Sequence, residues 1–325
     1  MRLLLKIVVA FVAVAFVGLA AAIMWPVDRP SAAKASVNAP FANVDFSSLP
    51  TQRNFPASDG TNIAFRAYEA MQPAVVALLL HGSSSHGRSM HALAEALRAK
   101  GITAYAIDIR GHGDSGRRGD VDAIGQPAED VRAFLSWIGK RHPDVPRTLV
   151  GFSLGGGLAL NAAGEKKPTG IDKLVLLAPM LGPTALPSVM PNPHRSGDRW
   201  AFPHLPRIIA LSILNSVGIT GLNFLPTIQY AVGDIEGLTG TYSYRLMMSL
   251  LPSDFAALLT GVDVPVEIIV GQKDEVFVAR GYEQAVGPVR ADISVRVLPD
   301  LNHIELILDP MGHTAIAEAV LATPR

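Results

Sequence analysis

The sequence has no cysteine among its 325 residues. This absence excludes disulfide bonds, thiolate metal sites and a cysteine nucleophile. Neither sign of charge is in excess, because Lys+Arg and Asp+Glu both number 28. We therefore expect no nucleic-acid partner, since no positive field is available to hold one. Charged residues make up 17% of the chain and hydrophobic residues 49%, which is enough apolar material for one large core or two smaller ones.

A long uncharged run begins close to the N-terminus. It covers residues 7–25 and follows Arg2 and Lys6. A signal peptide has an apolar stretch of roughly 7–15 residues, whereas a membrane-spanning helix needs about 17–25. The length predicts a transmembrane anchor over residues 1–25. The basic residues before the run predict a single-pass membrane protein with its body outside the cytoplasm.

A cleavable signal peptide is the alternative for the same segment. Ala20, Ala21 and Ala22 are small enough to form a signal peptidase site. Cleavage there would leave a secreted or periplasmic protein in place of an anchored one. Residues 26–50 are rich in Pro, Ala, Ser and Asn without a sustained period, which predicts a linker before the body.

Apolar runs alternate with segments of helical spacing from residue 51 onward. Alternation of this kind predicts an α/β fold, with a mostly parallel central sheet and helices on both faces. The strands are expected at residues 62–68, 75–80, 103–107, 147–152, 173–178, 265–270 and 294–298. The helices are expected at residues 90–99, 128–138, 154–163 and 315–321.

One segment, at about residues 180–261, interrupts this alternation. It is rich in proline at first, apolar throughout, and contains no clear buried strand. A long excursion between two sheet strands is more often an inserted subdomain than a loop. We therefore expect a cap over the carboxyl ends of the strands, where ligands bind to such sheets.

A G-x-S-x-G motif lies between an expected strand and an expected helix. It reads Gly151-Phe152-Ser153-Leu154-Gly155. In this context the serine lies on a sharp turn with its hydroxyl exposed at the edge of the sheet, and the glycines allow close backbone approach. The motif predicts that Ser153 is a nucleophile. A glycine-rich turn with an incidental serine is the alternative.

A serine nucleophile needs a base to accept its proton and an acidic residue to orient that base. On sheets of this kind the chain order is Ser, then Asp or Glu, then His. Asp274 follows the strand at 265–270, and His303 follows the strand at 294–298. The order predicts catalytic roles for Ser153, Asp274 and His303. An ordinary turn residue is the alternative for Asp274.

Three other residues compete for these roles. Glu275 adjoins Asp274 and is expected to point elsewhere if Asp274 faces the site. Asp300 is expected to be a turn residue. His313 lies where a helix begins and not at the end of a strand.

Two backbone N–H groups are needed to stabilise the oxyanion that forms on attack. We expect one from Leu154, the residue after the nucleophile, and one from Ser83, in the loop after the strand at 75–80. His81 precedes the nucleophile in the chain and is expected to brace this loop.

A further loop covers residues 108–116 and contains Asp108, His112 and Asp114, which could form a metal site. Its glycines and Arg110 favour a rigid, hydrogen-bonded turn instead. The chain also has no dinucleotide or P-loop fingerprint.

Five motifs together resemble the α/β-hydrolases close to monoacylglycerol lipases and lysophospholipases. They are Leu80-His81-Gly82, residues 108–115, Gly151-Phe152-Ser153-Leu154-Gly155-Gly156, Gly271-Gln272-Lys273-Asp274 and Asn302-His303. The resemblance runs from about residue 55 to the C-terminus and implies an α/β-hydrolase domain over residues 51–325. It also implies a Ser-Asp-His triad, an oxyanion hole at Ser83 and Leu154, and no cofactor. The cap and the N-terminal segment depart from the family pattern.

These observations favour a serine hydrolase that cleaves carboxylic esters. The aromatic and methionine side chains of the cap, together with the expected anchor, favour a lipid-like substrate such as a monoacylglycerol or lysophospholipid. The same side chains would serve equally to pack the cap onto the body. Cleavage of an amide, a peptide or a carbon–carbon bond by the same triad is the alternative, and a non-catalytic anchored binding module is a third possibility.

Overall fold

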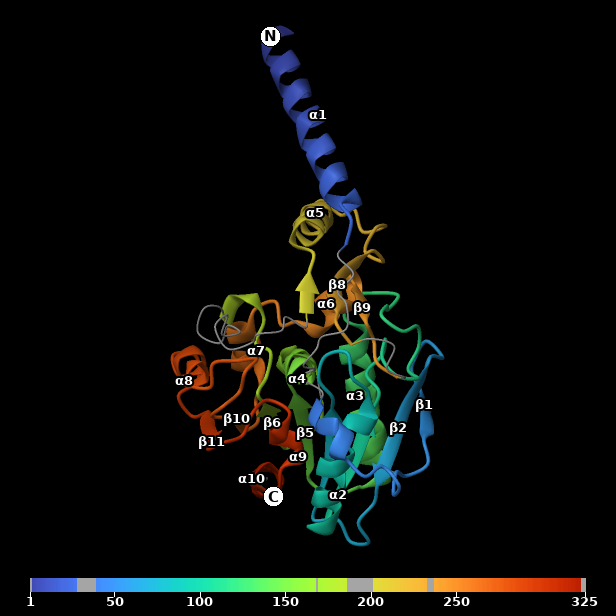
Figure 1. The fold of residues 1–325 in the computed structure, drawn as a ribbon, viewed down its shortest axis with the longest axis vertical. Helices are drawn as coiled ribbons and strands as arrows, with labels where there is room; N and C mark the ends of the chain where they lie inside the picture. The colour runs from blue at the N-terminus through green and yellow to red at the C-terminus, as the bar shows by residue number, and fades with distance from the viewer. Residues whose placement is uncertain (1, 28–38, 168, 186–200, 233–236, 323–325) are drawn as a thin grey trace.

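The computed structural model of the chain describes residues 2–27, 39–167, 169–185, 201–232 and 237–322. Figure 1 shows a body built on a central sheet, an upper layer of helices and short strands, and the N-terminal helix projecting away from both. The two termini lie at opposite ends of the molecule.

The body is built on an eight-stranded sheet with the order β1-β2-β4-β3-β5-β6-β10-β11. Its strands are β1 (Arg53–Pro56), β2 (Asn62–Tyr68), β3 (Val75–Leu80), β4 (Ile102–Ile107), β5 (Arg147–Phe152), β6 (Lys173–Leu177), β10 (Val266–Gly271) and β11 (Ser294–Leu298). From β4 to β11 all neighbours are parallel, whereas β2 is antiparallel to β1 and to β4. Every residue of β3, β4 and β6 is buried, because both faces of the sheet are covered.

The helices of the body pack in two groups, in which α2 contacts α10 and α3 contacts α4. The bounds are α2 (His91–Ala99), α3 (Gln126–Arg141), α4 (Leu154–Gly164), α8 (Gly281–Val286), α9 (Glu305–Leu308) and α10 (Pro310–Leu321). A 3-10 turn, η2 (Gly87–Met90), precedes α2. The α/β architecture expected from the sequence, a mostly parallel sheet with flanking helices, is confirmed.

The strand order reverses at β3. The chain passes outward from β3 to β4 and then returns to place β5 on the other side of β3. At such a switch point the two following loops leave the sheet in opposite directions and open a crevice at the carboxyl ends of the strands. The loop after β3 begins at His81, and the turn after β5 holds Ser153.

The described residues between β6 and β10 form a small sheet and three α-helices. Its elements are η3 (Pro183–Ala185), β7 (Ala201–Pro203), α5 (Leu205–Ser216), β8 (Pro226–Tyr230), β9 (Thr241–Ser243), α6 (Tyr244–Leu250) and α7 (Phe255–Gly261). The strands form an antiparallel sheet in the order β7-β8-β9. Both α6 and α7 contact α4, so this cap lies against the helix that begins after Ser153.

The N-terminal segment forms α1 (Arg2–Met24), and α5 of the cap lies beside its lower end (Figure 1). The transmembrane anchor expected over residues 1–25 is not confirmed. Across the residues that the structure describes, no helix combines the length and the apolar character needed to cross a membrane.

The end of α1 is held by Arg207 of α5. Its guanidinium donates hydrogen bonds to the backbone carbonyls of Ile23 (2.8 Å), Trp25 (2.9 Å) and Pro226 (2.8 Å). The last carbonyls of a helix have no partner within the helix, and a cation also interacts favourably with that end of the helix dipole. The contact therefore ties the end of α1 to the cap.

Part of the expected linker at 26–50 contacts the body. Residues 39–43 form the 3-10 turn η1 (Ala39–Asn43), which contacts α9, and Phe41 packs against the core. The Phe46 ring lies 5.8 Å from the ring of His91, measured between centroids. Residues 28–38 of the same linker lie outside the described residues.

Candidate active site

Ser153 occupies the turn between β5 and α4 in a strained backbone conformation. Its φ is 55° and its ψ is −118°, a combination that residues with a Cβ rarely adopt. Four backbone hydrogen bonds hold the turn. Ser153 N–H donates to the carbonyl of Leu177 (2.8 Å), while its own carbonyl accepts from Gly156 (3.0 Å), Gly157 (3.3 Å) and Met180 (2.9 Å). Hydrogen bonds from the neighbouring strand and from the start of the cap therefore hold this serine in its strained conformation.

The glycines of the motif are required by contact. A Cβ at Gly155 would lie 2.6 Å from the backbone oxygen of Leu80, and one at Gly156 would lie 2.7 Å from Cβ of Pro179. Distances this short do not occur for real side chains, so only glycine allows α4 to begin this close to β3. The sequence-based prediction of a sharp strand–turn–helix at Ser153 agrees with this geometry.

Asp274 and His303 form a buried hydrogen-bonded pair. Nδ1 of His303 lies 2.7 Å from Oδ2 of Asp274, and both side chains are almost completely inaccessible to solvent. The other carboxylate oxygen, Oδ1, accepts from the backbone N–H groups of Val276 (2.8 Å) and Phe277 (2.7 Å). Because a carboxylate only accepts, Nδ1 must carry the proton, and Nε2 is left as the basic nitrogen.

The imidazole of His303 packs beside the turn that contains Ser153. Its ring centroid lies 4.8 Å from that of Phe152, the residue before Ser153, and 5.5 Å from that of Phe277. Ser153, Asp274 and His303 follow β5, β10 and β11 respectively, so all three lie at the carboxyl edge of the sheet. Each of them is buried.

The three competing residues are directed elsewhere. The carboxylate of Glu275 accepts the backbone N–H of His303 (2.9 Å), which holds the histidine loop from the outside. Asp300 lies at the surface and forms an ion pair with Lys273. His313 is bonded through Nε2 to the carbonyl of Ile307 (2.9 Å).

The loop after β3 passes directly over Ser153. A Cβ at Gly82 would lie 3.3 Å from Cβ of Ser153 and 3.2 Å from the Phe152 ring. Ser83 is the next residue of this loop, and Leu154 is the first residue of α4, where N–H groups lack partners within the helix. The two expected oxyanion donors thus belong to segments that flank the serine on both sides.

His81 braces this loop, as expected. Its Nδ1 lies 2.8 Å from the carbonyl of Gly82, and its Nε2 accepts the backbone N–H of Ile109 (3.0 Å). The ring is buried, and burial lowers the pKa of His81 to about 3. The side chain is therefore a neutral structural element that joins the loops after β3 and β4.

The loop at 108–116 is internally hydrogen-bonded. Asp108 accepts from the backbone N–H groups of Gly87 (2.7 Å) and Asp114 (2.9 Å), while Arg110 binds the carboxylates of Asp59 and Asp130 (2.6 Å each). Within the described ranges, no group of three or more His, Asp or Glu side chains is arranged to hold a metal ion.

Most of the large cap side chains pack inward. Tyr242, Tyr244, Met247 and Phe255 are buried, whereas Phe224 is 52% exposed. Trp200 lies outside the described residues. Most of the cap side chains that the sequence analysis considered as substrate contacts are therefore used to pack the cap onto the body. Tyr242 also contacts the loop after β3, a role for which the sequence carries no local signal.

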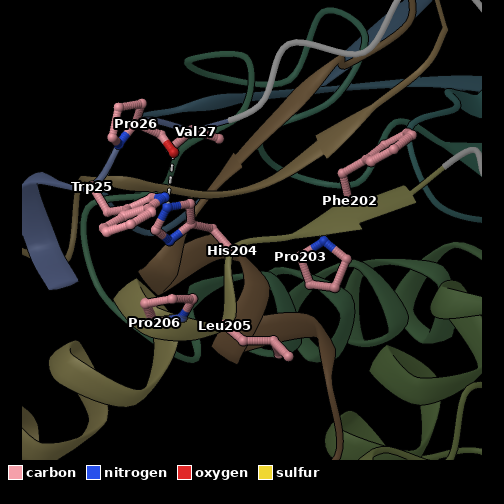
Figure 2. Close-up of a pocket in the computed structure, with 8 residues that line it drawn as sticks. All are labelled: Trp25, Pro26, Val27, Phe202, Pro203, His204, Leu205 and Pro206. Carbon is pink, nitrogen blue, oxygen red and sulfur yellow. Dashed lines mark hydrogen bonds between the residues drawn. The ribbon is translucent and has the colours of Figure 1, made fainter.

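A pocket lies where the end of α1 meets the cap, and it shares no residue with the site around Ser153. Figure 2 shows its lining residues from two segments, with Nε2 of His204 bonded to the carbonyl of Pro26 (3.1 Å). They are Trp25, Pro26, Val27, Phe202, Pro203, His204, Leu205 and Pro206.

Known proteins share both the sequence pattern and the architecture of this chain. A monoacylglycerol lipase of Mycolicibacterium smegmatis is 25% identical over 273 residues, which are 79% of this chain and 91% of the relative. A monoglyceride lipase of Mus musculus is 29% identical over 177 residues, which are 54% of this chain and 52% of the relative.

Solved structures of other hydrolases share the fold. A soluble variant of the monoglyceride lipase of Saccharomyces cerevisiae, in complex with a substrate analog, has a TM-score of 0.64 at 19% identity and covers 86% of this chain and 98% of its own. A carboxyl esterase of Bacillus coagulans in complex with glycerol has a TM-score of 0.61 at 17% identity, with 84% and 96% covered.

One family model matches residues 71–310, which include β3, the turn at Ser153, the cap and both loops that hold Asp274 and His303. The chain therefore belongs to the Hydrolase_4 family, described as serine aminopeptidase S33, and is an α/β-hydrolase that resembles monoglyceride lipases.

Proposed function

We propose that this hydrolase cleaves carboxylic esters with a lipid-like acyl group, such as monoacylglycerols or lysophospholipids, through Ser153, His303 and Asp274. The observation that carries the proposal is the buried hydrogen bond between His303 and Asp274, beside a serine on a strained turn. The activities named for the monoacylglycerol lipase and monoglyceride lipase relatives support an ester as the substrate.

The chemistry follows the acyl-transfer scheme. Oγ of Ser153 attacks the ester carbonyl while Nε2 of His303 takes the hydroxyl proton. The tetrahedral intermediate carries its negative charge toward the N–H groups of Ser83 and Leu154. When the intermediate collapses, His303 gives the proton to the leaving alcohol, and an acyl-enzyme remains. Water then attacks the acyl carbonyl, His303 again accepts and returns a proton, and the carboxylic acid is released.

Asp274 has two tasks in this scheme. It fixes the imidazole in the tautomer that leaves Nε2 free, and it stabilises the imidazolium that forms during each half-reaction. Its second oxygen is held by Val276 and Phe277, so the carboxylate cannot rotate away from His303.

A second candidate is amide or peptide cleavage, because the matching family model is described as a serine aminopeptidase. The same three residues would carry out that reaction, since His303 can protonate a leaving amine as well as an alcohol. The two candidates differ only in the substrate that fits beneath the cap.

A substrate panel separates the candidates. Monoacylglycerols and p-nitrophenyl esters of increasing chain length are assayed beside aminoacyl p-nitroanilides, with Ser153→Ala as the control for background hydrolysis. Turnover of long-chain esters, lost in the control, supports the proposal. Cleavage of the anilides without turnover of any ester would replace it with the peptidase alternative.

A further inference from the structure

The loop after β3 that contains Ser83, here called the oxyanion loop, is hydrogen-bonded to the cap. Ser83 bonds with the side chain of Tyr230, and Ser84 makes three further hydrogen bonds. The backbone N–H of Ser84 donates to the hydroxyl oxygen of Tyr242 (2.6 Å), and its Oγ donates to the carbonyl of Thr239 (2.5 Å). Its own carbonyl accepts the N–H of Thr239 (2.8 Å). Every hydrogen-bonding group of Ser84 therefore has a partner in the cap segment 239–242, about 155 residues further along the chain.

The backbone of Ser84 is in the left-handed region, with φ at 64°. This conformation is unfavourable for a residue with a Cβ. It persists only where the surroundings hold it in place. At Ser84 the surroundings are the three hydrogen bonds from the cap, so the shape of the loop depends on the cap segment.

The Tyr242 hydroxyl is oriented by a second buried residue, His112. Its oxygen lies 2.5 Å from Nε2 of His112, and the two rings meet edge to face at 5.0 Å between centroids. Burial lowers the pKa of His112 to about 3, so the ring is neutral at pH 7 and Nε2 can accept. The Tyr242 hydroxyl accepts from Ser84 N–H and can donate its proton to Nε2 of His112, and the Tyr230 side chain is hydrogen-bonded to it as well.

The peptide on the other side of Ser83 is fixed as well. His81 donates to the carbonyl of Gly82, and in a trans peptide the N–H of Ser83 points opposite to that carbonyl. The Gly82–Ser83 peptide is thus held by His81, and the Ser83–Ser84 peptide by Tyr242 and His112. The expected oxyanion donor, Ser83 N–H, belongs to the first of these two immobilised peptides and is followed directly by the second.

We propose that Tyr242 of the cap is a positioning residue for the oxyanion hole, which it holds together with His112 by fixing the peptide that follows Ser83. The inference rests on the proposed function, because it assigns Ser83 N–H to the oxyanion. The cap is then a part of the catalytic scaffold in addition to covering the site.

The test compares Tyr242→Phe with Tyr105→Phe. Tyr105 is also a buried tyrosine whose hydroxyl bonds a histidine, at 2.8 Å from Nε2 of His142, but it lies on β4 among Phe65, Phe134 and Trp137. The two variants lose the same chemical group from a tyrosine–histidine pair. If kcat falls in Tyr242→Phe and not in Tyr105→Phe, the cause is therefore the position of Tyr242 next to the oxyanion loop and not a general loss of stability.

The expected result for Tyr242→Phe is a fall in kcat of about 10- to 100-fold with KM within about twofold of the wild type. Loss of one oxyanion donor costs 10²–10³-fold, and here the donor is displaced and not removed. The inhibition constant of an alkyl trifluoromethyl ketone, whose adduct carries an oxyanion, should rise by a similar factor, because only transition-state binding is weakened. The Tyr105→Phe variant should keep all three values within about twofold.

Equal kcat in the two variants would overturn the inference, and so would a loss confined to KM. If Tyr242→Phe does not fold, His112→Phe carries the test, because it keeps an aromatic ring against Tyr242 and removes the nitrogen that bonds the Tyr242 hydroxyl. A fall in kcat of at least threefold relative to Tyr105→Phe is then expected, and no fall overturns the inference.

The rate of fluorophosphonate labelling separates this inference from the proposed function. The reagent forms a P–O bond to Ser153 and releases fluoride, and its phosphoryl oxygen occupies the oxyanion hole whatever the natural substrate is. If the wild type labels but turns over no ester, the ester proposal fails. The labelling rates of Tyr242→Phe and Tyr105→Phe still decide the inference, with a slower rate in the former expected and equal rates contradicting it.

Discussion

His303 is bonded through Nδ1 to Oδ2 of Asp274 at 2.7 Å, with both side chains shielded from water. The same carboxylate uses its second oxygen to cap the turn that continues to Phe277. Asp274 is therefore both a structural residue of its loop and the partner of the proposed base, and these two roles can be separated by mutation.

The Asp274→Asn variant should retain the structure of the loop but lose catalytic activity. The amide oxygen can still accept from Val276 and Phe277, whereas the amide nitrogen faces His303 and forces the proton onto Nε2. We expect kcat to fall by about 10⁴-fold, the cost of the wrong tautomer in a serine–histidine–aspartate site. Ester kinetics check the loss, and thermal unfolding within a few degrees of the wild type shows that the loop is intact. A variant with more than a tenth of wild-type kcat would contradict the role of Asp274.

Ser153→Ala and Ser153→Gly should both be inactive but differ in stability. Removal of the nucleophile is expected to lower turnover by about 10⁶-fold. Glycine adopts φ 55° and ψ −118° without the strain that a Cβ brings, so it relieves part of the 1–3 kcal/mol held at this turn. We expect Ser153→Gly to unfold at a higher temperature than Ser153→Ala, by calorimetry on matched samples. The reverse order would mean that the turn stores no strain.

Glu275 is expected to act on catalysis through the backbone of His303. Its carboxylate accepts the His303 N–H at 2.9 Å. Glu275→Ala leaves that N–H without its charged acceptor and should lower kcat by about tenfold, since a hydrogen bond to a charged group contributes roughly 1.5–3 kcal/mol. Glu275→Gln retains an amide oxygen at the same place and should stay within about threefold. Similar values for the two variants would argue against this hydrogen bond.

The buried histidines should make the fold sensitive to mild acid. Burial lowers the pKa of His81 and of His112 to about 3, whereas an unfolded histidine has a pKa near 6.5. Below pH 6.5 the unfolded chain binds more protons than the native one. The free energy of unfolding therefore decreases as the pH is lowered. Each such residue contributes a slope of up to about 1.4 kcal/mol per pH unit, until the native pKa is reached.

Urea unfolding between pH 7 and pH 4 measures this slope. His86, His91, His142 and His313 also have a lowered pKa because of burial, so the whole slope belongs to several residues. The contribution of one residue is isolated by His112→Gln, whose slope should be smaller than that of the wild type over this range. Parallel curves for the two proteins would show that His112 can be protonated in the native state.

Arg207 should control the order of the α1–cap junction without affecting chemistry at Ser153. Arg207→Met removes three donors from the carbonyls of Ile23, Trp25 and Pro226. We expect faster amide hydrogen exchange in peptides that cover residues 20–27, because opening of this segment then requires less free energy. Turnover of a short p-nitrophenyl ester is the internal control and should not change. Unaltered exchange would mean that other contacts hold the junction.

The parallel sheet could be predicted from the sequence because its strands are continuous apolar runs. The runs at 75–80 and 147–152 match β3 and β5 from end to end. The ends of helices are not predicted correctly where a polar capping residue, and not an apolar pattern, determines them. The last helix was expected from residue 315 but begins at Pro310, where Asp309 caps it through the N–H of Met311 (2.8 Å). The short edge strand β1, with mostly exposed residues, has no apolar pattern to reveal it.

The residues proposed for the site could be predicted because each follows a strand. Ser153, Asp274 and His303 were placed by chain order, and the structure brings Asp274 and His303 into contact. Their catalytic roles stay predictions. Tyr242 could not be found in this way, because it reaches Ser84 from a cap whose small sheet has no buried apolar run in the sequence. A tertiary contact between residues 158 positions apart produces no periodic pattern in the sequence.

The hydrogen bonds of Arg207 bear on the alternative that the N-terminal segment is a cleavable signal peptide. The first acceptor of Arg207 is the carbonyl of Ile23, the residue immediately after the alanines at 20–22 that resemble a peptidase site. Proteolysis after Ala22 would remove most of α1 and still leave Ile23, Trp25 and Pro26 attached to the cap. The outer edge of the cap would then keep the same hydrogen bonds in the precursor and in the processed protein, with a new N-terminal amine at Ile23.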